Sequence, residues 1–481
     1  MRFYRQTLLA FFAVLICAPL HSQSVTLELS ADQFVEMVLT KSLNTQNIKN
    51  SFRVNESGYF ASRREILFPN LSLTSQASRS KSIQETAATL TDSASNNLEL
   101  AQPFIWGGNL SIAAAQETSQ ATNEASNAAT TQTFSRNFPK FSVTYQQPLF
   151  IFTGNQRWRT WKRNLLNFKN QSGSFQLQLQ SIEFDARAQY DNAVIALERL
   201  NVEKQKLKSS QLLFNITQAW VESGRIAQVE LMRAQINKKL DERRLRNAEI
   251  SAQQALNSLK NLVLIPENQE VVLVSTFTYK PLRVSLETLQ NTALQYRLDL
   301  QNARQNIELS ELAIKETREQ NFPQMNASAG YRIDYLETSQ RPENWNILLS
   351  MNWKLFDSGI NSLSVDQKKL ALENSKRDLE LLKRQVKLEV ENAYLDVTNT
   401  QEQIDDFSET RQQALANIEA VRLRYERGID RLIDVFDAEN SLRSLEIEYL
   451  ALVSTFNNSK NKLSLLVGKR IGEIEKNEKP F

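Results

Sequence analysis

The sequence predicts a mainly α-helical protein with a smaller portion of β-strands, and three observations lead to this prediction. Two very long stretches lack proline, the residue that a helix interior tolerates least. The same series of landmarks occurs twice along the chain, which indicates duplicated long helical hairpins. Between the helical parts, short segments alternate apolar and polar residues, as strands with one apolar face do.

The composition predicts long elements and excludes several kinds of chemistry. The 481 residues include only 11 Gly and 10 Pro, so few turns are expected. The single Cys and the single His are Cys17 and His21. Residues 23–481 therefore offer no thiol or imidazole for catalysis or for a zinc site of the usual type. Sites built from carboxylates alone stay open, but we expect no enzyme, no catalytic residue, no metal site and no cofactor.

Residues 1–22 have the three parts of a secretory signal peptide. Arg2 and Arg5 precede the apolar run from Leu8 to Leu20, and Ser22 is a small residue suited to a cleavage site. The alternative is a transmembrane anchor, but the run is shorter than the roughly 20 residues that span a bilayer. Removal of two basic residues changes the formal charge from 57 − 54 = +3 to 55 − 54 = +1. This balance does not favour a nucleic-acid partner.

The long helices are expected in the proline-free stretches, 149–265 and 343–479. From Leu379 to Tyr425 apolar residues recur at steps of three or four, so one face of a helix spanning roughly 362–427 is apolar. An ordinary core helix averages only about 11–12 residues, so a helix of this length needs other helices packed along it. Shorter helices are expected at 34–67, 226–264, 286–320 and 429–467.

The landmarks of the repeat define the expected domains. Phe68-Pro69 recurs as Phe322-Pro323, Leu149-Phe150 as Leu355-Phe356, and Gly224 as Gly428. The first repeat then covers 23–264, with strands at about 71–149 and a long helical hairpin at about 154–264. A linker with a small mixed element follows at 265–285. The second repeat covers 286–468, with strands at about 325–356 and a hairpin at about 361–467, before a tail at 469–481.

The segments of period two are interpreted as strands. Residues 345–355 and 141–145 alternate, and Leu71 with Leu73 and Leu98 with Leu100 look similar. Such strands fit the wall of an outer-membrane barrel, but they equally fit a half-buried soluble sheet. The stretch 74–136, rich in Ser, Thr, Asn, Gln and Ala, is expected to be an exposed loop with an extra hairpin near 102–109.

In these features the chain resembles the TolC family of outer-membrane channels, over nearly all of residues 23–481. The motifs are Gln147-Pro148-Leu149-Phe150, Trp353 to Gly359 leading into a long helix, and Arg424 to Gly428 followed by Asp434-Val435-Phe436-Asp437-Ala438-Glu439. The resemblance implies a homotrimer in the outer membrane of a Gram-negative-type cell. The hairpins would form an α-barrel tunnel across the periplasm. The strands would form a shared trimeric β-barrel, with four per chain making 12.

The resemblance also implies a function and partners. The protein would be the exit duct of a tripartite efflux pump or a type I secretion system. A periplasmic adaptor (membrane fusion) protein and an inner-membrane pump of RND or ABC type would open it. The tips that dock the adaptor would be at Gly224, Arg225, Gly428 and Ile429. The alternative for the two glycines is that they only permit a positive φ between helices.

A pore gate is the other site that the resemblance implies. Asp434 and Asp437 would ring the closed entrance and attract cations, with Glu230 in the equivalent place of the first half. The alternative is that acidic residues favour the first turns of a helix through its dipole. Candidates for the hydrogen bonds that hold the gate closed are Tyr425, Asp430 and Arg431.

Two other classes of protein share some of these features. A periplasmic coiled-coil adaptor also has helical hairpins, but it needs a β-rich domain flanking a single hairpin. A secreted structural coiled coil would not need duplicated strand pairs with aromatic ends. A membrane pore separates the exit duct from both alternatives.

Overall fold

The computed structural model describes residues 27–84, 87–125, 128–136, 139–266, 268–274, 279–335 and 342–477. The signal peptide predicted at 1–22 lies outside the described residues. The elements run in the order β1 (Leu27–Leu29), α1 (Ala31–Lys41), α2 (Leu43–Leu67), β2 (Asn70–Gln84), β3 (Ala87–Pro103), β4 (Asn109–Ala125), β5 (Ala128–Arg136), β6 (Lys140–Leu149), α3 (Gln156–Glu222), α4 (Gln228–Leu262), β7 (Val271–Leu273), α5 (Leu286–Tyr296), α6 (Leu298–Glu319), β8 (Gln324–Asp334), β9 (Glu343–Asn352), α7 (Ile360–Glu426), α8 (Leu432–Val467) and α9 (Ile471–Asn477).

The chain divides into two compact units, each assembled from three separate segments. The unit that carries both glycine turns, here the tip unit, consists of Met1–Ser42, Asp185–Lys280 and Gln403–Thr455. The unit that carries strands β2 to β9, except β7, is here the sheet unit and comprises the remaining segments. The long helices α3 and α7 begin in the sheet unit and end in the tip unit.

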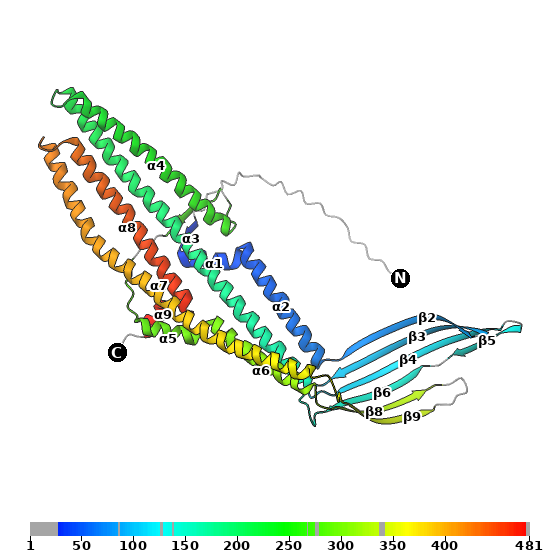
Figure 1. The fold of residues 1–481 in the computed structure, drawn as a ribbon. Coiled ribbons are helices and arrows are strands. Elements are labelled where there is room, and N and C mark those ends of the chain that lie inside the picture. Colours follow the sequence, from blue (N-terminus) through cyan, green and yellow to red (C-terminus); the bar gives the residue numbers. More distant parts are fainter. Residues whose placement is uncertain are drawn as a thin grey trace, which may run out of the picture. The chain divides into compact units, whose positions relative to one another are not determined.

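In the tip unit, α4 and α8 return beside the ends of α3 and α7 (Figure 1). Their contact faces form one core, made of Leu213, Ala234, Ile418, Tyr425, Leu432, Val435, Phe436 and Ala438. A short parallel pair, β1 with β7, lies near α1 in the same unit. The hydroxyl of Tyr190 on α3 donates toward the carbonyl oxygens of Leu29 (2.8 Å) and Val274 (3.0 Å). This side chain therefore ties the long helix to both strands.

In the sheet unit, aromatic rings join α2 to α3. Phe52 stacks on Phe175 with ring centroids 4.3 Å apart, and Tyr59 stacks on Phe168 at 4.5 Å.

The predicted apolar face of the helix at 362–427 is confirmed as a buried face of α7. Its fully or nearly buried members are Leu379, Val386, Val390, Ala393, Val397, Ile404, Ile418 and Tyr425.

Two predicted helices, 34–67 and 286–320, are each broken, which corrects the expectation of single elements. The first divides into α1 and α2 at Ser42, whose ψ is 133°. The second divides into α5 and α6 at Arg297, whose φ and ψ are −61° and 125°. Neither break falls at a Gly or Pro. At Arg297 the guanidinium contacts Asp299 and Glu389, both at 2.7 Å, so the residue at the break is held by two ion pairs.

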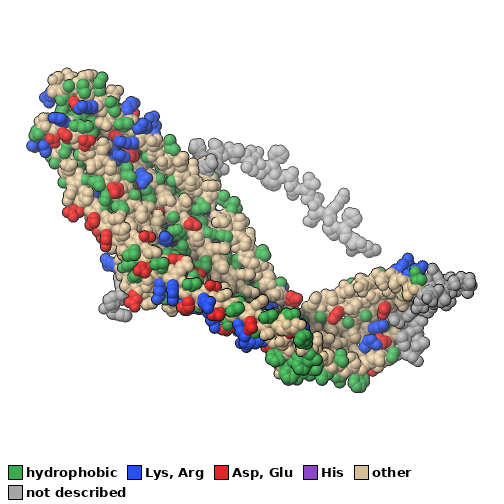
Figure 2. Space-filling model, in the orientation of Figure 1, with side chains coloured by type: hydrophobic (Ala, Val, Ile, Leu, Met, Phe, Trp, Pro, Cys, Tyr) green, Lys and Arg blue, Asp and Glu red, His purple; other side chains and the backbone are tan. Residues whose placement is uncertain are grey.

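The strands of the sheet unit form one antiparallel sheet in the order β2-β3-β4-β6-β8-β9 (Figure 1). Strand β5 pairs with the outer part of β4, and β6 pairs with its inner part. β5 and β6 therefore occupy the same position in the sheet. Hydrophobic side chains gather at the helix-side end of this sheet, and few charged side chains lie on it (Figure 2).

The exposed loop predicted at 74–136 is wrong, whereas the hairpin predicted within it near 102–109 is present as the turn from β3 to β4. In the described residues this stretch is β-structure, with β2 paired to β3 from Asn70–Ala101 to Gln84–Ala87 and β3 paired to β4 over 17 positions of each strand. Polar cross-strand pairs support these ladders, including Ser75 with Asn96 and Arg79 with Asp92. Runs of Ser, Thr, Asn and Ala lack the contrast in polarity that reveals a strand, so composition indicated a loop instead.

The fold class predicted from the sequence is confirmed, since long helical hairpins occur twice with strands between them. The tail predicted at 469–481 contains the short helix α9, and the linker at 265–285 contains β7. Across the described residues, no helix combines the length and apolar character needed to cross a membrane.

Candidate functional site

Both helical hairpins turn through the same backbone motif. At the end of α3, the N–H of Arg225 bonds to the carbonyl of Trp220 (2.9 Å), and that of Gly224 to Val221 (2.9 Å). At the end of α7, Ile429 bonds to Arg424 (2.9 Å), and Gly428 to Tyr425 (2.8 Å). Each glycine has φ +73°. These are Schellman turns, in which the residue after the helix takes a left-handed conformation that favours glycine.

Replacing Gly428 by alanine is expected to lower the free energy of unfolding by about 1 kcal/mol. The cost is conformational, because no atom lies within 4 Å of the position a Cβ would take. Gly58, exposed inside α2, is the matched control, and Gly58→Ala is expected to raise stability by roughly 0.5–1 kcal/mol. Denaturant unfolding of both variants measures whether each one lowers or raises the free energy of unfolding. Equal effects would show that the turn does not need the left-handed conformation.

Two acidic residues in the first turns of α8, Asp434 and Asp437, lie exposed just after the second turn. The carboxylate of Asp434 accepts a hydrogen bond from the backbone N–H of Arg431 at 2.9 Å. Asp434 therefore caps the start of α8, as the helix-dipole alternative expects. Asp437, one turn further, is exposed on the same side of the helix. Both carboxylates are open to solvent in the single chain, so capping does not prevent Asp434 from facing a pore.

Glu230 and Tyr425 come together, although they belong to different hairpins. Glu230 pairs with Arg233 on its own helix at 2.9 Å, and its other carboxylate oxygen is buried. Burial raises the pKa of Tyr425, and the charge of Glu230 raises that pKa further. The Tyr425 hydroxyl lies 3.2 Å from that of Thr217, and its ring packs on Trp220. Tyr425 therefore joins the two hairpins within one chain.

The remaining predicted site residues lie around the turns. Asp430 pairs with Arg424 at 2.9 Å, which closes the second turn. Arg431, Arg225 and Ile429 are exposed, and Ile429 has 63% of its surface open. Exposed apolar side chains continue along the first turns of α4, at Val229, Met232 and Ile236. The turns thus present apolar and charged side chains together, which is also visible in Figure 2.

The structure adds a buried polar cluster that the sequence did not predict. Lys206 on α3 and Glu439 on α8 lie 2.5 Å apart, with side chains 6% and 4% exposed. Arg422 on α7 approaches the same carboxylate to 2.7 Å, and Ser209 donates to it at 2.5 Å. Burial would raise the pKa of Glu439, but Lys206, Arg422 and Ser209 together hold it below its usual value. The cluster connects three helices of the tip unit.

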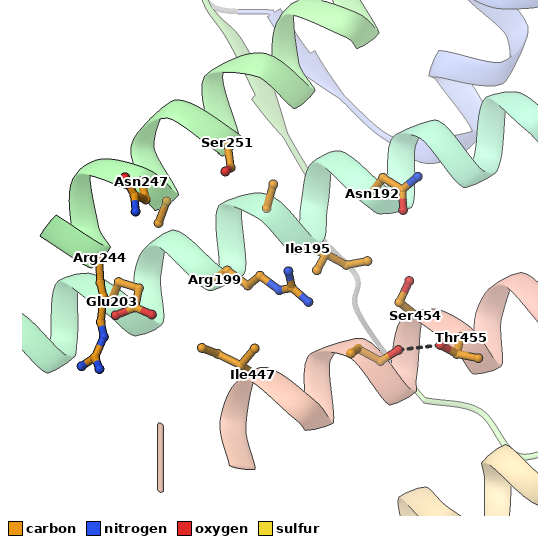
Figure 3. Close-up of a pocket in the computed structure, with 13 residues that line it drawn as sticks. Asn192, Ile195, Arg199, Glu203, Arg244, Asn247, Ser251, Ile447, Ser454 and Thr455 are labelled. Carbon is orange, nitrogen blue, oxygen red and sulfur yellow. Dashed lines mark hydrogen bonds between the residues drawn. The ribbon is translucent and has the colours of Figure 1, made fainter. Parts of the chain in front are cut away.

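A pocket of about 570 Å³ opens between α3, α4 and α8 of the tip unit (Figure 3). Its charged lining residues are Arg199, Glu203 and Arg244, and the rest are amide, hydroxyl and apolar side chains. Glu203 is already paired with Arg443 at 2.8 Å. Among the residues that the structure describes, no group of His, Cys, Asp and Glu is arranged to hold a metal ion.

A second pocket, of about 780 Å³, lies in the sheet unit where strands meet helices. Arg159 forms an ion pair with Glu319, and Arg163 pairs with Glu316 at 2.9 Å. Glu319 also accepts the backbone N–H of Gly154 at 2.8 Å. These contacts bind the start of α3 to the end of α6, so they hold the strands' attachment points in place.

Comparison with known proteins identifies the fold. Residues 289–469 match a family described as outer membrane efflux protein. Among solved structures, CusC has a TM-score of 0.67 at 15% identity and covers 91% of this chain and 92% of its own. The open state of the Neisseria gonorrhoeae MtrE outer membrane channel has a TM-score of 0.67 at 17% identity, with 92% and 89% covered. The Campylobacter jejuni CmeC outer membrane channel has a TM-score of 0.65 at 15% identity, with 93% and 89% covered. No curated protein sequence matches the chain.

Proposed function

Because residues 289–469 match the outer membrane efflux protein family and the described chain is similar in fold to outer membrane channels, we propose that this protein is an exit duct. It sits in the outer membrane as a homotrimer and extends into the periplasm. It serves a tripartite efflux pump or a type I secretion system, and it performs no chemistry and needs no cofactor. A periplasmic adaptor and an inner-membrane pump, of RND or ABC type, open it.

The observation that carries this proposal is that the sheet has two unpaired edges and an exposed apolar face. In the part of the chain that the structure describes, β2 pairs only with β3 and β9 only with β8. Large apolar side chains of these edge strands are exposed, such as Leu73 (69%) and Trp345 (75%). A sheet with two open edges and an apolar face cannot stand alone in lipid, because each unpaired backbone group there is costly. Closure with further copies of the chain satisfies both edges.

The gate is proposed to lie at the turns of the tip unit. Asp434, Asp437 and Glu230 begin the returning helices, and the first two are exposed. In a trimer, Asp434 and Asp437 supply six carboxylates to one ring, which attracts cations and resists anions. The docking tips for the adaptor are Gly224, Arg225, Gly428 and Ile429, with the exposed apolar side chains of α4 beside them. Tyr425, Asp430 and Arg431 hold the closed arrangement.

Single-channel recording in planar bilayers tests the proposal. The purified protein is expected to form small, cation-selective channels, and Asp434→Asn/Asp437→Asn is expected to abolish most of that selectivity. The matched control is Asp366→Asn, whose carboxylate is exposed on α7 beside Lys369 and is expected to leave selectivity unchanged. Channels with unaltered selectivity in the double variant would retain the duct and reject the gate. A folded protein that never conducts would contradict the duct and favour a periplasmic adaptor or structural role.

A further inference from the structure

We propose, building on the exit-duct function, that each chain contributes six strands to the membrane wall, so that three copies close an 18-stranded barrel. The two strands in question are β3 and β4, which the sequence placed largely in a loop. In Figure 1 they lie within the sheet between β2 and β6. The alternative is a four-stranded contribution with β3 and β4 outside the membrane.

The first argument is the continuity of the apolar face through β3 and β4. Directly paired residues of an antiparallel sheet point to the same side. One row crosses all six strands and is made of Leu71, Leu100, Ile112, Val143, Tyr331 and Trp345. All six side chains are exposed in the single chain, at 38% or more. β3 and β4 thus supply apolar side chains where a lipid-facing wall requires them.

The opposite face of the same strands carries polar or small side chains. The row one position along is made of Ser72, Glu99, Ala113, Ser142, Arg332 and Asn344. Its members are polar or small, as the lumen side of a water-filled barrel is. Further out, the apolar face ends, and Arg79 pairs with Asp92. The inner halves of β3 and β4 therefore match a membrane band, and their outer halves extend beyond it.

The second argument is the anchoring of the turn that joins β3 to β4. The guanidinium of Arg157, in the first turn of α3, donates to the carbonyls of Phe104 (3.1 Å) and Gly108 (2.8 Å). Asn155 donates to Ile105 at 2.7 Å. Trp106 stacks on Phe104 at 4.4 Å and donates toward the Tyr145 hydroxyl at 3.3 Å. The hairpin is fixed at the helix-side end of the sheet, as a wall strand must be.

The topology closes only with a second copy at each edge. Successive strands alternate in direction along the six positions, so β9 of one copy runs antiparallel to β2 of the next. An even number of strands per chain lets the ladder continue around the ring without a parallel pair. Barrel diameter grows roughly linearly with strand number, so 18 strands give a lumen about 1.5 times as wide as 12 would.

Spin-label distances measure this width. The label is placed at Ser328→Cys on the lumen side of β8, in an otherwise cysteine-free chain that carries Cys17→Ser. Pulsed electron resonance then compares the trimer with a variant lacking 87–125, which leaves β2, β5–β6, β8 and β9. Distances between protomers about 1.5-fold longer in the full chain are expected. Equal distances in two assembled trimers would overturn the 18-stranded wall while leaving the exit duct intact.

A second measurement keeps the inference testable if the deletion variant does not assemble. In liposomes, a label at Ile112→Cys is expected to collide mainly with oxygen dissolved in lipid, and one at Ala113→Cys mainly with a water-soluble nickel chelate. Val143→Cys and Ser142→Cys on β6 give the reference pattern for a wall strand. Water access at both 112 and 113 would place the hairpin outside the membrane. A full chain that yields no three-fold distances would instead contradict the proposed trimer itself.

Discussion

Replacing Glu439 by leucine is expected to lower the free energy of unfolding by about 3–5 kcal/mol, the cost of leaving one member of a buried ion pair without its partner. The side chain of Lys206 is 6% exposed, and its ammonium lies 2.5 Å from this carboxylate. Without Glu439 that charge stays buried among three helices of the tip unit. Guanidinium unfolding of the variant, followed by helical circular dichroism, measures the loss.

The double variant Lys206→Met/Glu439→Leu distinguishes the contribution of the paired charges to stability from that of side-chain packing. It is expected to recover most of the stability, because apolar side chains of similar volume often replace a buried pair at no net cost. Lys369→Ala, which removes an exposed pair with Asp366, is the control and is expected to change stability little. Equal losses in the single and double variants would show that the cluster acts by shape rather than by charge.

The contribution of this cluster to stability is expected to decrease as the pH falls. The pKa of Glu439 in the folded chain is held below its usual value. Its contribution is therefore complete above the pKa of the unfolded chain and declines as the pH falls through the folded value. Part of the acid sensitivity of the wild-type protein should accordingly disappear in the double variant.

Replacing Asp191 by asparagine is expected to stabilise the protein at pH 7.5 by at most about 3 kcal/mol, and to have little effect at pH 4. Burial raises the pKa of Asp191 to about 6, against the opposing charge of Arg187. The folded chain therefore holds its proton more tightly than the unfolded chain, whose carboxyl titrates near 4. Stability from this group is complete below pH 4 and is lost as the pH rises through 6.

Unfolding curves of Asp191→Asn at the two pH values measure this difference. Asp185→Asn, at an exposed position on the same helix, is the control and is expected to change stability little at either pH. A variant that is less stable than the wild type at pH 7.5 would contradict the prediction. It would mean that Arg187 stabilises an ionised Asp191 more than burial disfavours it.

The helices could be predicted from the sequence because their signals are local. Absence of proline and a period of three to four residues placed α7 within two residues of each observed end. The breaks at Ser42 and Arg297 gave no such signal. At Arg297 the guanidinium pairs with Glu389, 92 positions away, and no local pattern reports such a contact.

Among the strands and the site residues, too, only the features with a local signal could be predicted. β6 and β9 have apolar faces with clear alternation, whereas the outer halves of β2 and β3 are polar on both faces and were mistaken for a loop. The glycine turns were located from single residues, because a left-handed residue between two helices favours glycine. The buried Lys206–Glu439 pair joins residues 233 positions apart. Glu439 stood out only as part of a repeated motif.

The parallel pairing of β1 with β7 has a consequence for the order of folding. Leu27 pairs with Val271, which lies 271 − 27 = 244 positions later. The tip unit also requires Gln403–Thr455, so its core cannot be completed until nearly the whole chain has been synthesised. Contacts of such long range form slowly, because loop closure precedes their stabilisation. The apolar faces of the early helices thus stay uncovered in the nascent chain, and holding chaperones should set its yield more strongly than its final stability does.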